Sequence, residues 1–248
     1  MPAKLVKSII VFCLVVVFLP VTSIWAASLI TDPALAKAIR AELKLPANKE
    51  VKAVDLQKLD SLYPMESKNK IVSLQGLEYA VNLQSLFVPG QKIKSITPLS
   101  KLKKLTFVAV DGNQITDLSP LSGLSSLENL VVQGNKIKSL APLKNLHKLT
   151  DLLAGNNQVA DLRPLQNLKL EWLILSGNQI KDLTPLKNNS TLEHLYLDDN
   201  LIQDIEVLET MPHLKEVFLA DNPLNKQAEQ VIQNLENNGV IVDLGDNG

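Results

Sequence analysis

The stretch LTFVAVDGNQITDLSPLSGLSS, residues 105–126, decides the fold because the chain copies it on both sides. Its Asn113 recurs in neighbouring copies at intervals of 22 residues, with a single interval of 21. A Pro-Leu pair and the first Leu of each copy recur in the same register. Three sets of positions in one register do not arise by chance, so the sequence predicts a stack of similar units. The recurring polar positions are Asn69, Gln91, Asn113, Asn135, Asn157, Asn178, Asn200 and Asn222.

Each copy follows L-x-x-L-x-L-x-x-N-x-I-x-x-L-x-P-L-x-x-L, the pattern of a leucine-rich repeat, which predicts a strand, a turn and a short 3₁₀ return segment. In the strand of the quoted copy, Val108 and Val110 are expected to enter the core. Phe107, Ala109 and Asp111 then face outward. The Asn carboxamide is expected to satisfy turn amides and to bond the next Asn of the ladder. A single copy cannot bury its own Leu residues, so only the stack is stable.

Helices are predicted to cover the N-terminal end of the stack. Asp32 and Pro33 suit the N-cap and the first position of a helix, and apolar residues follow at helical spacing. A second short helix is predicted near residues 54–59. Val54, Leu56 and Leu59 are expected to face inward from it. Such a cap keeps the apolar end of a solenoid away from water.

The outer repeats depart from the pattern. Residues 61–82 are expected to form an imperfect first repeat, since Ser61 and Pro64 stand where the pattern requires Leu. After the last repeat a longer helix is predicted, which Asn225 can cap and Gly239 can end, followed by a closing strand at residues 240–242. The one-residue deletion at residues 168–170 is expected to tighten the convex side only. The predicted units are a signal peptide at 1–26, a helical cap at 27–60, repeats at 61–224 and a C-terminal cap at 225–248.

The first 26 residues have the pattern of a secretory signal peptide. Two lysines precede an apolar run at residues 9–19, which is short for a membrane span, and small residues follow up to the Ala26-Ala27 pair. Cleavage after Ala26 is preferred, cleavage after Ala27 is the second choice, and a retained anchor is the competing interpretation. Cys13 is the only cysteine, so the mature chain would be thiol-free. The predicted location is extracellular, with loose association with the cell surface as an alternative.

Composition and motifs point away from catalysis. The chain is 46% hydrophobic and has a formal net charge of −1, which fits one elongated domain and gives no basic surplus for nucleic acid. No metal-ligand pair, nucleophile motif, phosphate loop or dinucleotide fingerprint is found, so we predict no enzyme, cofactor or metal site. An acidic group could in principle hold Ca²⁺, but its spacing matches no calcium loop and a solvated edge is preferred. It comprises Asp198, Asp199, Glu216 and Asp221.

Four features together resemble the bacterial internalin-like leucine-rich repeat proteins. They are the signal peptide, the cap opening at Asp32-Pro33-Ala34-Leu35, the junction IVSLQGLEY at residues 71–79, and 22-residue repeats reading N-x-I-x-D-L-x-P-L. The resemblance implies an α/β fold, a right-handed leucine-rich repeat solenoid with a concave parallel β-sheet, short 3₁₀ return segments, a helical N-terminal cap and a helix-strand C-terminal cap. In that family the concave sheet binds another protein, commonly on a host cell. No immunoglobulin-like domain, wall-sorting motif or C-terminal membrane segment is found, so the resemblance implies a secreted binding module.

The outward strand positions are the predicted binding surface. Seven aromatic residues lie outside the signal peptide, and five of them occupy these positions, whereas Tyr63 and Tyr79 are assigned to the cap region. Strand propensity favours apolar residues in general, but it does not explain Phe87, Phe107 and Trp172 facing solvent in a chain with 4% aromatic residues. The predicted protein-binding residues are Phe87, Phe107, Val131, Leu153, Trp172, Ile174, His194, Tyr196 and Phe218.

The predicted partner is an unidentified protein on a host or bacterial surface, with no nucleic acid and no membrane span after leader cleavage. A carbohydrate or cell-wall polymer is the alternative, because aromatic rings beside Asp and Asn also suit sugars. Lysines beside the Asn ladder could meet an anionic polymer, although solvation is the preferred role. They are Lys92, Lys94, Lys136 and Lys138. A structural spacer without a ligand is the third hypothesis.

Overall fold

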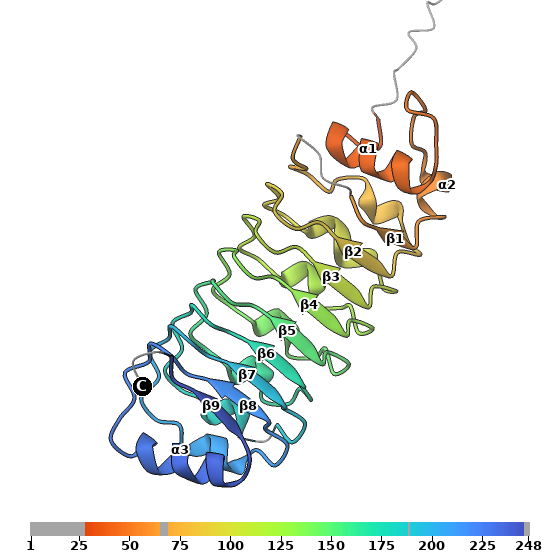
Figure 1. The fold of residues 1–248 in the computed structure, drawn as a ribbon. Coiled ribbons are helices and arrows are strands. Elements are labelled where there is room, and N and C mark those ends of the chain that lie inside the picture. Colours follow the sequence, from red (N-terminus) through yellow and green to blue (C-terminus); the bar gives the residue numbers. More distant parts are fainter. Residues whose placement is uncertain (1–27, 65–68, 188, 246–248) are drawn as a thin grey trace, which may run out of the picture.

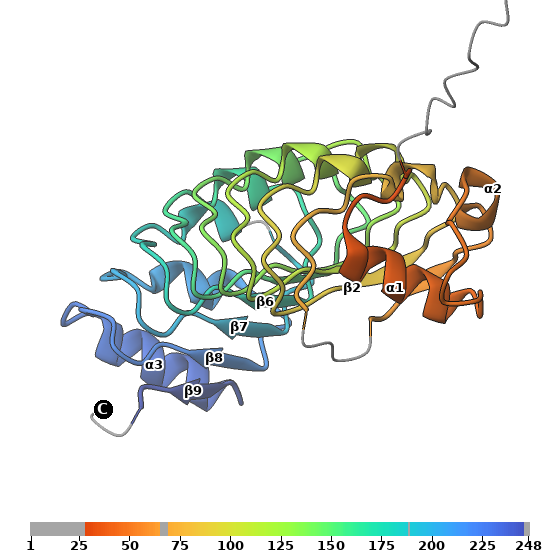
Figure 2. The same ribbon diagram turned by 90° about the horizontal axis from the view of Figure 1, so that it is seen from above.

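The computed structural model describes residues 28–64, 69–187 and 189–245, so the predicted signal peptide lies outside the described residues. Within these ranges the chain forms one parallel sheet of nine strands in chain order, and short 3₁₀ segments lie on the opposite side of the stack (Figures 1 and 2). This is the predicted leucine-rich repeat solenoid. The strands are β1 (Ser61–Leu62), β2 (Ser85–Phe87), β3 (Phe107–Ala109), β4 (Asn129–Val131), β5 (Asp151–Leu153), β6 (Trp172–Ile174), β7 (His194–Tyr196), β8 (Glu216–Phe218) and β9 (Ile241–Asp243).

The return segments carry the convex side. In six of the seven 3₁₀ segments, the residue just before the segment is a Leu or Ile. Its backbone carbonyl accepts the first hydrogen bond of the segment, as Leu118 O does from Leu121 N at 2.9 Å. Their inward Leu residues are fully buried, together with the central residue of each strand from β2 to β8. Each such burial contributes about 1.5–3 kcal/mol, so stability comes from the stack as a whole. The 3₁₀ segments are η1 (Leu77–Tyr79), η2 (Thr97–Lys101), η3 (Ser119–Leu121), η4 (Ala141–Leu143), η5 (Arg163–Leu165), η6 (Thr184–Leu186) and η7 (Glu206–Thr210).

The asparagine ladder stabilises the turns that follow the strands. Asn113 donates through Nδ2 to the carbonyls of Val88 at 3.0 Å and Val110 at 2.9 Å, and its Oδ1 accepts from the amide of Ile93 at 2.9 Å. The side chain therefore bonds the backbone of its own repeat and of the preceding one. The prediction that each Asn bonds the next Asn is wrong, because both ends of the carboxamide are already used by backbone groups. Asn135, Asn157, Asn178, Asn200 and Asn222 repeat this arrangement.

The N-terminal cap consists of α1 (Pro33–Glu42) and α2 (Ala53–Leu56), and α1 lies at the end of the sheet (Figure 1). Asp32 caps α1 as predicted, and its second carboxylate oxygen accepts from Val72 N at 2.7 Å and Ser73 N at 3.0 Å. Burial alone would raise the pKa of Asp32, but bonds from four backbone amides outweigh it and lower the pKa below 3.8. One side chain thus joins the cap to the first repeat.

The inward orientation predicted for Val54 is wrong, since this side chain is 58% exposed. Helix α2 is a single turn, and its Leu56 is fully buried. Residues two positions apart on a helix point in very different directions, so both cannot face the core. Leu59 is buried as predicted.

The first repeat begins two residues earlier than the pattern predicted. Leu62 pairs with Leu86 although 24 residues separate them, where the paired residues of β2 to β8 are 21 or 22 apart. The assignment of core positions to Ser61 and Pro64 is therefore wrong. Leu59 and Leu62, both buried, fill those positions, and Tyr63 takes the place beside Phe87.

The C-terminal end forms the predicted helix and closing strand, with the strand at Ile241–Asp243 instead of 240–242. Helix α3 (Ala228–Asn237) packs below the last strands, and Asn225 Oδ1 accepts from Ala228 N at 3.1 Å (Figure 1). Gly239 ends the helix with a φ of +83°, a conformation that other residues rarely adopt. Strand β9 then pairs with β8.

The short interval near residue 169 leaves the register intact, because Asp151 still pairs with Trp172. No helix in the described ranges is long and apolar enough to cross a membrane.

Candidate functional site

The first and third residues of each strand point away from the core and form two rows across the concave face, with the strands paired in register. Ala109 is an exception to the predicted exposure: it is 1% exposed, because its methyl group lies between the larger side chains of Phe87 and Val131. The first row is Ser85, Phe107, Asn129, Asp151, Trp172, His194 and Glu216. The second row is Phe87, Ala109, Val131, Leu153, Ile174, Tyr196 and Phe218, and Tyr63, which directly follows β1, extends it beside Phe87.

Four predicted residues come together at the C-terminal end of the face. The ring of Trp172 lies 4.0 Å from that of His194, with the planes 27° apart, and 6.2 Å from that of Tyr196. Tyr196 in turn stacks on Phe218 at 4.5 Å, with an interplanar angle of 11°. We call these four rings, with Glu216, the aromatic cluster. It spans β6, β7 and β8, which are adjacent in the sheet (Figure 1).

Glu216 holds two of the rings in place. One carboxylate oxygen, Oε1, lies 2.8 Å from His194 Nδ1 and also accepts a hydrogen bond from the Tyr196 hydroxyl. The bond from Tyr196, followed by that from His194, lowers the pKa of Glu216, while the bond to Glu216 raises the pKa of Tyr196 to about 12. At neutral pH the carboxylate is therefore ionised and the phenol is protonated. The carboxylate thus links the rings of His194 and Tyr196.

The N-terminal end of the face holds a looser aromatic group, formed by Tyr63, Phe87 and Phe107. Tyr63 and Phe87 lie 6.1 Å apart with their planes 33° apart, and their exposed fractions are 48% and 39%. Tyr63 was assigned to the cap from sequence, but it belongs to this face. The alternation Ser-Leu-Tyr at 61–63, matching Ser-Leu-Phe at 85–87, is the signal that could have found it.

Polar and aliphatic side chains separate the two aromatic ends. In the first row Asn129 donates its amide to the carboxylate of Asp151. In the second row Val131, Leu153 and Ile174 are half-buried. The nine predicted residues thus lie on one face, but contacts between aromatic rings form only at its two ends.

The acidic residues near the strand ends have two structural roles, as hydrogen-bond acceptors and as turn residues with positive φ. Asp198 accepts from Ser176 Oγ at 3.0 Å and from Ala220 N at 3.1 Å. Asp199 and Asp221 have φ values of 52° and 54°, at turns where Gly112 stands in another repeat. Asp tolerates this left-handed region better than most residues, which gives these two a role in the turn. No group of three or more His, Cys, Asp or Glu in the described part of the chain could hold a metal ion.

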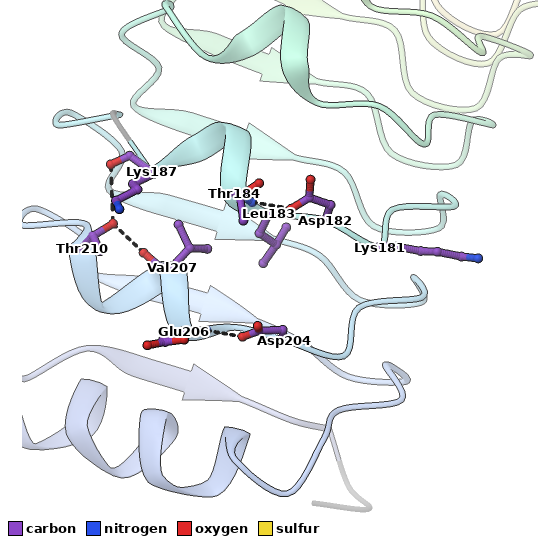
Figure 3. A pocket seen from close by; sticks show the side chains of 9 residues that line it. All are labelled: Lys181, Asp182, Leu183, Thr184, Lys187, Asp204, Glu206, Val207 and Thr210. Carbon is purple, nitrogen blue, oxygen red and sulfur yellow. Dashed lines mark hydrogen bonds between the residues drawn. The ribbon is translucent and has the colours of Figure 1, made fainter.

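A groove on the convex side, between η6 and η7, is shown in Figure 3. Asp182 accepts from Thr184 N at 2.8 Å, and Asp204 accepts from Glu206 N at 2.9 Å, so its carboxylates cap the turns. Similar grooves lie between η1 and η2 and between η7 and α3. These grooves follow from the spacing of the repeats on the convex side, and the aromatic face is the stronger candidate.

Comparisons with known proteins agree with this architecture. A family model described as leucine-rich repeats in two copies matches residues 125–167, 169–209 and 190–237. The crystal structure of internalin C2 from Listeria monocytogenes is 31% identical, with 88% of this chain and 95% of that chain covered and a TM-score of 0.76. No curated protein sequence matched significantly.

Two further structures show how widely the fold recurs. The functional domain of InlJ from Listeria monocytogenes is 22% identical over 78% of this chain and 51% of its own, with a TM-score of 0.55. The ectodomain of the Arabidopsis thaliana receptor kinase GASSHO1/SCHENGEN3, solved in complex with CASPARIAN STRIP INTEGRITY FACTOR 2, is 25% identical over 60% and 19%, also with a TM-score of 0.55. From the repeats, the capped solenoid and the similarity to internalin C2 along almost its whole length, the chain belongs to the internalin-like family of bacterial leucine-rich repeat proteins.

Proposed function

We propose that the chain is a secreted, non-enzymatic module that binds a protein partner through its concave face, with the aromatic cluster at the centre of the interface. The observation that carries the proposal is the set of stacked rings held by Glu216 on a solvent-facing sheet. Interface energy concentrates in a few aromatic and arginine residues, and rings that are already ordered lose little entropy on binding.

The size of the face supports this role. Strands lie about 4.8 Å apart, so the eight positions of the second row span roughly 34 Å. A stable protein interface buries about 800 Å² on each partner, which such a face can supply. The plant receptor ectodomain with the same fold was solved with a bound partner, which supports a protein or peptide ligand for leucine-rich repeats in general.

Carbohydrate binding is the second candidate. A sugar ring stacks on an open aromatic face, which Tyr196 does not offer because it lies between Trp172 and Phe218. Extracellular location rests on the signal peptide. Expression with the leader should therefore release a thiol-free protein that begins near Ala27.

Site-specific photo-crosslinking tests the face directly. A photoreactive amino acid replaces Leu153 or Ile174 on the concave side, and in a matched control it replaces the exposed Lys144 on the convex side. The variants are incubated with surface proteins of the source bacterium and of candidate host cells. We expect defined protein adducts from the two concave positions and none from Lys144. Adducts from Lys144 alone would contradict the proposal, and glycan-array binding without adducts would favour the carbohydrate alternative.

A further inference from the structure

The indole of Trp172 uses only one of its two faces. Both of its ring contacts, His194 and Tyr196, come from β7. The other face is directed toward β5, where the register places Asp151 opposite Trp172 and Leu153 opposite Ile174. Trp172 remains 39% exposed, and no aromatic contact is formed on the β5 side among the described residues. The aromatic cluster therefore ends in an indole face on which no further ring is stacked.

Asp151 places a carboxylate beside that face. It accepts the amide of Asn129, which is neutral and fixes its orientation without cancelling its charge. Among the described residues on this part of the face, Lys215 forms an ion pair with Glu193, and His194 contacts Glu193 and Glu216; none of these contacts reaches Asp151. An indole face and an uncompensated carboxylate thus lie next to each other.

This pairing fits one chemical group better than others. Cations are attracted to the face of an aromatic ring, and indole is the strongest such ring. A guanidinium is planar, so it stacks on the ring and offers two parallel N–H donors to a carboxylate, whereas an ammonium cannot do both. A neutral or apolar group would cover Asp151 and remove water from its charge without replacing the lost interactions.

We propose that the space between Asp151 and Trp172 receives an arginine side chain of the protein partner. The guanidinium stacks on Trp172 as the next layer beyond His194 and pairs with Asp151. This rests on the proposed function and adds the chemistry of the residue that the partner must present.

Tryptophan fluorescence tests the site with small probes. The experiment uses the full chain with the substitution Trp25→Phe, so that Trp172 is its only tryptophan. The probes are three capped tripeptides, Gly-Arg-Gly, Gly-Lys-Gly and Gly-citrulline-Gly, where citrulline has the shape of arginine without its charge. We expect a saturable change with the arginine peptide, affinity weaker by about tenfold for the lysine peptide, and no saturation with the citrulline peptide.

Asp151→Asn keeps the shape and removes the charge, and it should weaken arginine-peptide binding by about tenfold. Asp204→Asn is the matched control, because it removes one carboxylate from a convex turn that Asn can also cap; it should change binding less than about twofold. Equal binding of the citrulline peptide, or an unchanged affinity in Asp151→Asn, overturns the inference. If the peptides fail in this way while crosslinks at Leu153 and Ile174 persist, the arginine site falls and the binding face stands. If no crosslinks form at these two positions, the proposal that the concave face binds a protein partner is rejected.

Discussion

The asparagine ladder and the concave face repeat with the same period but use it in opposite ways. Every ladder position must satisfy the same turn groups, and the same carboxamide does so in successive copies, as at Asn113 and Asn135. The concave positions face solvent, and they change from strand to strand, as from Asp151 to Trp172 to His194. Positions that hold the fold are therefore uniform. Positions that the fold does not constrain differ between repeats, and they distinguish this chain from others with the same fold.

The two aromatic ends of the concave face differ in order. Tyr63 and Phe87 meet at a tilt, whereas the cluster is stacked and is held by the Glu216 carboxylate. Immobilising a mobile side chain on binding costs about 0.5–1.5 kcal/mol, and rings that are already ordered avoid most of this cost. We therefore expect the energetic centre of the interface near β7 and not near β2.

The ladder should give the largest effect on stability. Asn113→Ala leaves the amide of Ile93 and the carbonyls of Val88 and Val110 without this partner in a buried turn. We expect a loss of about 3 kcal/mol in the free energy of unfolding, measured by urea denaturation. Lys138→Ala, on the exposed edge, should leave the midpoint unchanged. A wild-type midpoint for Asn113→Ala would show that the ladder does not carry the turns.

Glu216→Ala should affect binding more than folding. The side chain lies on the surface of the sheet, but without it His194 and Tyr196 lose their shared acceptor. We expect partner affinity to fall by about tenfold, or 1.4 kcal/mol, in a surface plasmon resonance measurement with the crosslinked partner. Unchanged affinity would mean that ring order is unimportant for recognition.

The cluster should respond to pH at both extremes. The pKa of Glu216 is lowered below 4.5, so its contribution is complete above that value and is lost as the pH falls through the lowered pKa. The pKa of Tyr196 is raised to about 12, so its contribution is complete below 10 and is lost as the pH rises toward 12. Near-ultraviolet circular dichroism should follow both changes. Glu216→Gln should abolish the acid transition, and its persistence would assign that transition to another group.

The smallest effect is expected at the N-terminal aromatic group. Phe87→Ala removes a loosely held ring, so affinity should change by less than about 0.5 kcal/mol in the same binding assay. Phe218→Ala is the matched change within the cluster and should cost more. The reverse order would place the interface centre near β2.

The repeat made most of the fold predictable. Because identical positions recur, the places of Asn113, Leu121 and the strand centres follow from the sequence, and so do the helical caps. Tyr63 was missed because two extra residues in the first repeat shift its strand out of the 22-residue count. The role of Glu216 was missed for another reason. Its bonds to His194 and Tyr196 depend on side-chain conformations across a strand boundary, which a linear pattern does not contain.

The central claim is that the aromatic cluster binds a partner without holding the fold together. Its most direct test measures the melting temperature and the partner affinity on the same preparations of Trp172→Ala and Tyr196→Ala, with Lys138→Ala as control. We predict melting temperatures within a few degrees of wild type and a loss of affinity of about 2 kcal/mol or more for each aromatic variant. Lys138→Ala should change neither quantity. Aromatic variants that unfold readily, or that bind the partner at full strength, would contradict the claim and direct the search to the convex side and the caps.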